Sequence, residues 1–158
     1  MVDKDTLKKI GFLRGLPDPV LEKISAIARL ETFDEESILF RQNQELALVY
    51  MLVSGRVFLN SRSSSGHSIT LDEVTPGRTF GLSALIEESS GTFSAVCAET
   101  SSIITISSEE MRSLFKSDFL AGHLIMAKVV EIFRSRMEKH TRYFIHSLTT
   151  HPEISRFI

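Results

Sequence analysis

Apolar positions recur with helical spacing at the start of the chain. In the segment LPDPVLEKISAIARL, Val20, Ile24 and Ile27 follow one another at spacings of four and three, which is typical of an amphipathic helix. Pro17 and Pro19 stand at the start of this stripe, where a missing backbone N–H costs little. Residues 1–29 are therefore predicted to be helical.

The pattern changes to short β-prone runs over residues 30–106. Gly, Ser, Pro and Asn separate these runs at intervals typical of a barrel or sandwich. The runs are SILFRQ, LALVYMLVSGRVFLNSRS, HSITLDEV, TFSAVCAE and SIITIS. Gly55, in VSGRV, predicts a tight connection between two strand halves, and Gly66, in SSSGH, predicts a loop tip.

Residues 107–146 are predicted to be helical again. Ser107 is the expected N-cap of a short helix, with Glu109 and Glu110 in its first turn, where the helix dipole favours carboxylates. A long helix is expected from about residue 119 to residue 146. Residues 147–158 are expected to form a hinge or the start of a further element, with Thr149 or Thr150 as a turn or cap and the remainder of that element absent.

The long helix carries two apolar stripes. The first has the spacings of an a/d seam over almost three heptads. It consists of Met126, Val130, Phe133, Met137, His140 and Phe144. The second consists of Ile125, Val129 and Ile132. Two apolar faces favour a helix that packs on its own domain with one side and on the same helix of a second copy with the other. The alternative is a single wide stripe that faces the core.

Composition and charge narrow the class of protein. The chain of 158 residues predicts one domain, and a net charge of −2 provides no field that attracts nucleic acid or anionic lipid. No run approaches the ~18 apolar residues of a membrane span, and the first ten residues lack a signal-peptide core. Cys97 is the single cysteine, so no internal disulfide can form. A cytoplasmic protein is expected.

No pattern of catalytic residues is visible in the sequence. It contains no Ser/His/Asp arrangement, metal-ligand spacing or P-loop. We therefore expect neither an enzyme nor a metal site.

Three phrases and their order resemble the cyclic nucleotide-binding domain, specifically the N-terminal sensor domain of the catabolite activator/fumarate-nitrate regulator (Crp/Fnr) family. They are FLRGLPDPVLEKI, ILFRQNQELALVYMLVSGRVFL and LDEVTPGRTFGLSALIEE, with Gly55, Gly77 and Gly81 where the family places glycine. The resemblance implies an α+β fold over residues 1–146. That fold is an antiparallel eight-stranded β-barrel (a double-stranded β-helix, or jelly roll) with flanking N-terminal helices and a long C-terminal dimerisation helix.

In that family, the loop after a Phe-Gly pair is a phosphate-binding cassette. A Glu of the cassette binds the ribose 2′-hydroxyl and an Arg pairs with the cyclic phosphate. Here the Glu position is Leu82, and the Arg position is Thr92, or Phe93 if the loop slips by one residue. The ligand-binding residues that the resemblance implies are Gly81, Leu82, Ser83, Ala84, Thr92, Phe93, Ser94 and, on the long helix, Thr141.

The missing charges predict weak binding of cyclic nucleotides. Loss of a buried Arg–phosphate pair costs about 2–5 kcal/mol, or roughly 30- to 3,000-fold in affinity. Arg78 is the nearest cation in sequence, and the strand alternation predicts that it points away from Gly81.

Two interpretations of the pocket stay open. It is a vestige filled by its own side chains, or it binds a less charged effector, because Leu82, Phe93 and Val96 make it apolar. Relatives without the Glu/Arg pair include haem-based sensors and sensors of small organic acids, so haem or a small organic acid is the possible cofactor or effector. His140 is a candidate haem ligand, although a polar seam residue that sets helix register is favoured.

The sequence thus predicts a ligand-sensing module of a Crp/Fnr-type transcription regulator. It is expected to form a homodimer through the long helix and to reach DNA only through a domain that this chain does not contain. The alternative is a standalone dimeric interaction module with a vestigial pocket.

Overall fold

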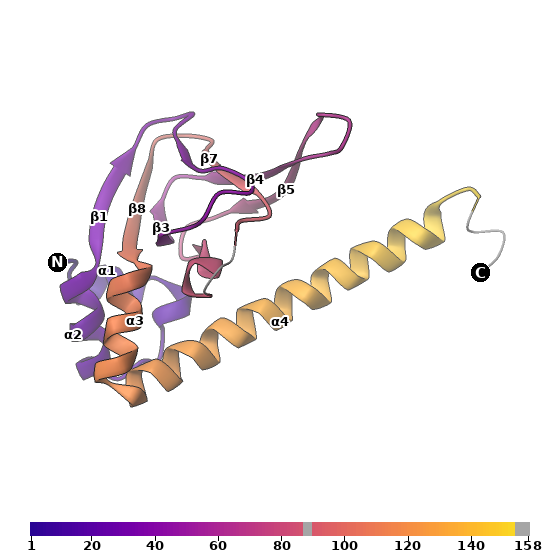
Figure 1. Ribbon diagram of the computed structural model, residues 1–158. Coiled ribbons are helices and arrows are strands. Elements are labelled where there is room, and N and C mark those ends of the chain that lie inside the picture. Colours follow the sequence, from indigo (N-terminus) through magenta and orange to yellow (C-terminus); the bar gives the residue numbers. More distant parts are fainter. Residues whose placement is uncertain (87–89, 154–158) are drawn as a thin grey trace. The chain divides into compact units, whose positions relative to one another are not determined.

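The computed structural model describes residues 1–86 and 90–153. The chain divides into a first unit, Met1–Gly122, and a second unit that begins at His123. The first unit contains the N-terminal helices, two β-sheets and a helix that comes after them in the chain (Figure 1).

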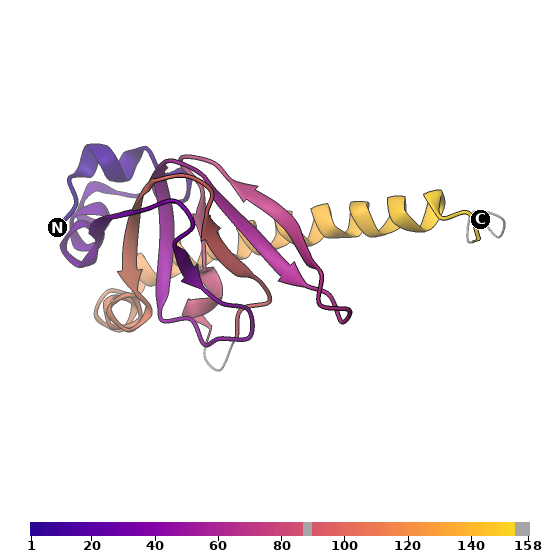
Figure 2. The same ribbon diagram turned by 90° about the horizontal axis from the view of Figure 1, so that it is seen from above.

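Three short helices form the N-terminal part of the first unit, as the sequence predicts. They are α1 (Lys4–Lys8), η1 (Gly11–Leu13) and α2 (Asp18–Ile27). Asp3 caps α1, because its Oδ1 accepts the Thr6 N–H at 2.9 Å. Val20 and Ile24 of the predicted stripe are buried. Figure 2 shows these helices gathered on one side of the strands.

In the part of the chain that the structure describes, eight strands form two antiparallel four-stranded sheets. The first sheet has the order β1 (Arg29–Phe33), β8 (Ser101–Ser107), β3 (Leu48–Ser54) and β6 (Thr79–Phe80). The second has the order β2 (Ile38–Phe40), β7 (Ser94–Cys97), β4 (Val57–Arg62) and β5 (Ser68–Val74). The predicted α+β, jelly-roll-like fold is confirmed, as two sheets rather than a closed barrel.

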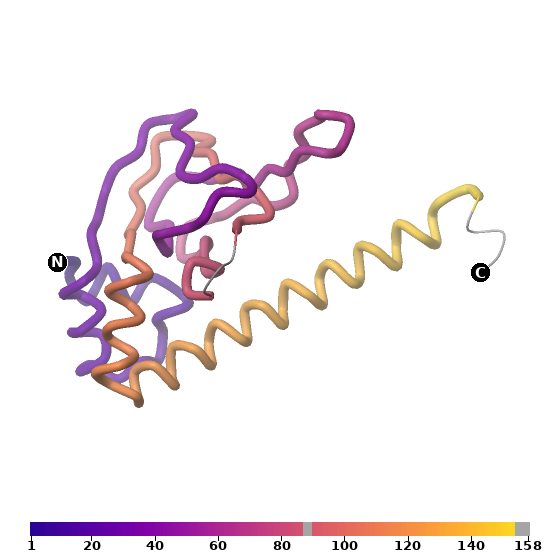
Figure 3. The backbone as a smooth tube through the Cα atoms, viewed as in Figure 1, coloured from indigo at the N-terminus to yellow at the C-terminus, as the bar shows by residue number. Residues whose placement is uncertain are grey.

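Two strands and one connection differ from the expectation. β1 and β6 are not among the β-prone runs, because β1 has almost no buried side chain and β6 has only two residues. Gly55 does connect two strands tightly, but β3 and β4 belong to different sheets, so the chain turns a corner there rather than forming a hairpin. Gly66 lies at the tip of the β4–β5 hairpin, which reaches beyond the neighbouring strands (Figure 3).

The first unit continues through α3 (Ser108–Ser117) into the start of α4 (Phe119–Thr150). The Ser107 Oγ accepts the Glu110 N–H at 3.4 Å, which confirms the predicted N-cap. Asp118 joins the two helices, since its carboxylate accepts the Ala121 N–H at 3.0 Å and pairs with Lys23 of α2. The hydrogen bonds from Lys23 and Ala121 lower the pKa of Asp118.

The second unit consists of the rest of α4, which extends beyond the expected end at 146 to Thr150. The hinge or further element was expected over residues 147–158, but α4 continues to Thr150, and residues 154–158 of that segment lie outside the described residues. Along α4 the two stripes differ in exposure. Ile125 and Val129 are buried, whereas Val130, Met137 and Phe144 are 62%, 65% and 66% exposed. In the described part of the chain, no helix combines the length and apolar character that crossing a membrane requires.

The corner at Gly55 provides a test of the fold. Gly55 has a φ of +95°, and a Cβ there would lie 2.3 Å from the Ser101 Oγ and 2.7 Å from its Cα. Gly66→Ala is the matched control, because Gly66 has a φ of +83° with open space around it. We expect Gly66→Ala to lower the free energy of unfolding by about 1–2 kcal/mol. Gly55→Ala should lower it by about 1–3 kcal/mol more in urea denaturation, and equal losses would contradict the steric argument.

Candidate functional site

The cassette loop, residues 81–98, begins at Gly81. Gly81 has a φ of +71° and precedes the short helix η2 (Leu82–Leu85). A Cβ at this position would lie 2.9 Å from Cδ2 of Tyr50 and 3.1 Å from the Leu48 carbonyl oxygen. Backbone conformation and packing therefore both require glycine here. Residues 87–89 of the loop lie outside the described residues, and with them Glu87 and Glu88.

The side chains of η2 belong to the core. Leu82, Ala84 and Leu85 are buried, whereas Ser83 is partly exposed. Arg112 of α3 holds this helix, because its Nη1 donates to the Ala84 carbonyl at 3.0 Å. The sequence analysis missed Arg112, since no local signal shows that a side chain of a later helix reaches this loop.

Four aromatic rings meet between the two sheets beside Gly81. They come from β2, β3, β6 and the residue before β7, namely Phe40, Tyr50, Phe80 and Phe93. The ring centroids of Phe40 lie 5.5 Å from Tyr50, 6.3 Å from Phe80 and 6.0 Å from Phe93, and Tyr50 stacks on Phe80 at 5.2 Å. We call this set the aromatic cluster. Such ring pairs each contribute about 0.5–1.5 kcal/mol beyond their buried area.

Tyr50 is the polar member of the aromatic cluster. Its hydroxyl donates to the Leu39 carbonyl oxygen at 3.2 Å. Burial raises the pKa of Tyr50, and the charge of Glu31 adds to that shift. The interior beside the cassette loop is thus apolar apart from one neutral, hydrogen-bonded hydroxyl of this cluster.

Strand alternation in β7 decides which residues of the cassette loop face this interior. Ala95 and Cys97 are buried, whereas Ser94 and Val96 are partly exposed. Phe93 shares the parity of the buried residues and contacts Phe40, while Thr92 is exposed. Position 93, rather than position 92, therefore faces inward.

Ser94 and Val96 lie on the opposite, outer face of β7. The Ser94 Oγ accepts the Gln42 N–H at 2.8 Å, and Val96 pairs with Ile38 of β2 in the sheet register. Val96 was expected to make the inner pocket more apolar, and that expectation was wrong, because it faces away from the aromatic cluster. The structure therefore brings Gly81, Leu82 and Phe93 close to the cluster but separates Ser94 from it.

Arg78 does not supply a cation to the cassette loop. Its Nη2 donates to the Asp72 Oδ2 at 2.8 Å and its Nη1 to the Glu73 carbonyl at 2.6 Å. These contacts agree with the expectation that Arg78 points away from Gly81. The remaining candidates, His140 and Thr141, are exposed on α4 in the second unit. Within residues 1–86 and 90–153, no group of His, Cys, Asp and Glu is placed to hold a metal ion.

Known proteins that are similar to this chain belong to the fold family that the two sheets of the first unit indicate. The family profile described as cyclic nucleotide-binding domain matches residues 30–118, more than half of the chain. This match confirms the resemblance seen in the sequence. No curated protein sequence matches the chain.

Solved structures share the fold. A presumed cyclic nucleotide-binding protein from Geobacter metallireducens is similar with a TM-score of 0.75 and 26% identity, over 87% of this chain and 99% of that one. The sensor domain of the transcriptional regulator DNR from Pseudomonas aeruginosa gives 0.68 and 18%, over 85% and 91%. The catabolite activator protein of Thermus thermophilus gives 0.74 and 20%, over 87% of this chain and 63% of that one.

The inward direction of Phe93 can be tested against its neighbour. Phe93→Ala removes a ring from the aromatic cluster, and because Phe93 is half-buried we expect the free energy of unfolding to fall by about 1–3 kcal/mol. Thr92→Ala is the control and should change it by no more than about 0.5 kcal/mol, since Thr92 is exposed. Chemical denaturation measures both. A larger loss for Thr92→Ala would show that the loop has the other register.

Proposed function

We propose that this chain, which belongs to the cyclic nucleotide-binding domain family, is a regulatory sensor module of Crp/Fnr type that does not bind cAMP or cGMP tightly. The observation that carries the proposal is that uncharged side chains occupy the inward face of the cassette loop. Leu82 is buried there, and Phe93 contacts the ring of Phe40.

Both charged family contacts to the nucleotide lack their counterparts. The family's Glu corresponds to Leu82, which is 1% exposed and has no acceptor for a ribose hydroxyl. The family's Arg corresponds to the inward-facing Phe93, whose ring cannot pair with a phosphate. A cyclic nucleotide placed there would keep a desolvated charge without a cationic partner, which is a costly arrangement in a protein interior.

We further propose that α4 forms the dimer contact. Val130, Met137 and Phe144 are exposed apolar side chains at seam spacing, and Arg134 and Glu138 form a pair between them at 3.6 Å. Exposed apolar rows of this kind mark association surfaces. A change in the pairing of two such helices is the two-state element through which a sensor moves an attached output domain. In a complete regulator that would be a DNA-binding domain in the cytoplasm.

A standalone interaction module with a vestigial pocket is the second candidate. The aromatic cluster favours it, since the rings of Phe40, Tyr50, Phe80 and Phe93 already occupy space between the sheets. In this alternative α4 still mediates dimerisation, and no small molecule acts through the cassette loop.

Titration calorimetry with cAMP tests the central claim. We expect no saturable binding below the high-micromolar range, because both charged contacts are missing. The double variant Leu82→Glu/Phe93→Arg, checked for folding by circular dichroism, should bind at least about 30-fold more tightly. A low-micromolar dissociation constant for the unmodified chain would refute the proposal. Thermal denaturation with haemin and small aromatic acids then separates the two candidates, since only a sensor gains stability from one of them.

The α4 seam can be tested by sedimentation. Phe133→Asp places a charge at a half-buried position of the stripe and should weaken the dimer by at least about tenfold, because a buried unpaired carboxylate costs more than about 1.4 kcal/mol. Ser135→Asp is the control, since Ser135 is exposed on the same helix outside the seam. If Phe133→Asp sediments like the unmodified chain, the stripe does not form the contact.

A further inference from the structure

The sheet β2-β7-β4-β5 has a second face with its own chemistry. Its register pairs Ile38 with Val96, Asn60 with Ser94 and Arg62 with Ser68, and paired residues project to the same side. The alternate residues of β7 and β4, such as Ala95 and Leu59, are buried. The paired set therefore lies on the outer face, away from the aromatic cluster.

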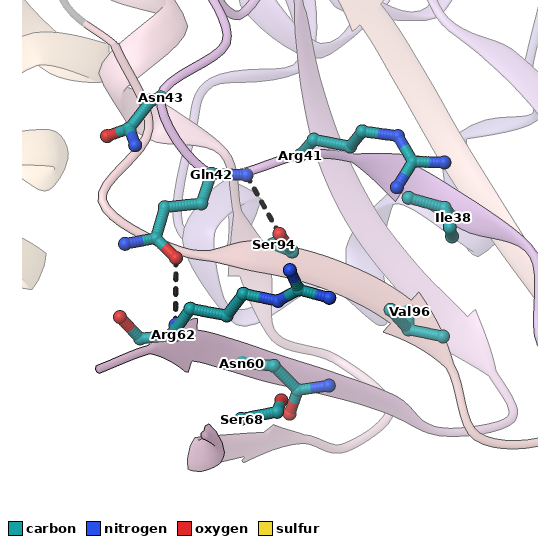
Figure 4. Close-up of a pocket in the computed structure, with 10 residues that line it drawn as sticks. Ile38, Arg41, Gln42, Asn43, Asn60, Arg62, Ser68, Ser94 and Val96 are labelled. Atoms are coloured by element: carbon teal, nitrogen blue, oxygen red, sulfur yellow. Dashed lines mark hydrogen bonds between the residues drawn. The ribbon is translucent and has the colours of Figure 1, made fainter. Parts of the chain in front are cut away.

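A pocket of about 470 Å³ opens on this outer face (Figure 4). Its volume falls within the range of small-molecule sites, roughly 300–1,000 Å³. The side chains that the argument uses are Ile38, Arg41, Asn60, Arg62, Ser94 and Val96. Polar groups dominate this set, with Ile38 and Val96 as an apolar wall.

The pocket is positively charged, although the whole chain has a net charge of −2. Arg41 and Arg62 line it, and none of its lining residues is acidic. In Figure 4 the two side chains run in the same direction across the outer face. Among residues 1–86 and 90–153, neither guanidinium pairs with a carboxylate. By contrast, Arg56 pairs with Glu99 and Arg78 with Asp72.

Two hydrogen bonds fix the backbone of the segments that carry the two arginines, whose side chains are exposed. The Gln42 N–H donates to the Ser94 Oγ at 2.8 Å, and the Gln42 Oε1 accepts the Arg62 N–H at 2.9 Å. Gln42 thus fastens the segment that carries Arg41 to both β7 and β4. A backbone fixed in advance loses less conformational entropy when a ligand binds, so that mainly the two arginine side chains would have to be ordered.

We propose that this outer-face pocket binds a small organic anion that carries two or more phosphate or carboxylate groups. A guanidinium presents a planar pair of N–H donors that matches the two oxygens of such groups. Asn60 and Ser94 offer hydrogen bonds to the remainder of the ligand, and Ile38 and Val96 contact its apolar part. This site shares Ser94 and Val96 with the cassette loop but lies on the opposite face of β7 from the aromatic cluster, so it does not depend on a ligand in the inner pocket.

Titration with inorganic pyrophosphate and with citrate, monitored by amide NMR shifts, tests the proposal. We expect saturable shifts centred on residues 60 and 94 with a dissociation constant below about 1 mM. Arg41→Gln and Arg62→Gln should each weaken binding about tenfold. Arg29→Gln is the matched control, because Arg29 is an exposed arginine on β1 in the other sheet and the variant loses the same charge.

Three outcomes would overturn the proposal. The first is that neither probe produces saturable shifts up to about 10 mM, a concentration about ten times the expected dissociation constant. The second is that all three arginine variants weaken binding equally, which would mean that only the net charge of the chain matters. The third is that a polyglutamate peptide binds in a way that depends on Arg41 and Arg62 while neither small anion binds. In that case the outer face recognises an acidic protein segment.

Discussion

The packing of Phe93 against Phe40, which also contacts Tyr50 and Phe80 of the other sheet, constrains what the cassette loop can do. A carboxylate and a guanidinium at the inward positions would be desolvated among these rings until a ligand arrived between them. Leu82 and the ring of Phe93 need no such partner and add dispersion contacts instead. The chain thereby keeps the backbone geometry of the loop, which Gly81 and Tyr50 fix together, and loses its ionic chemistry.

Strand β7 divides two environments of opposite character. Its inward residues, Ala95 and Cys97, continue an apolar interior, and burial raises the pKa of the Cys97 thiol, which keeps it protonated. Its outward residues, Ser94 and Val96, belong to a face with two guanidinium groups that pair with no described carboxylate. The side-chain period of two in a strand is sufficient to produce this separation over a few ångströms.

Local sequence patterns predicted the elements whose formation depends on residues close together in the sequence. Helical spacing identified Val20 and Ile24, and Ser107 was recognisable as a cap because capping involves only the next turn. β1 escaped detection because its side chains are largely exposed. The aromatic cluster could not be predicted, since its rings come from positions 40 to 93 and meet only through sheet pairing. The choice between Thr92 and Phe93 likewise needed the register of β7 rather than its sequence.

The two faces also differ in how easily a ligand could control the chain. A ligand shifts a conformational equilibrium only through a difference in its affinity for the two states. At the cassette loop, a new ligand would first have to displace rings of the aromatic cluster, and each lost ring pair removes about 0.5–1.5 kcal/mol. On the outer face, Arg41 and Arg62 are already apart from any described carboxylate, so an anion would not have to break an ion pair there. An anion at the proposed outer-face pocket would therefore need less binding energy to shift the conformation of the chain than a ligand at the inner pocket beside the cassette loop.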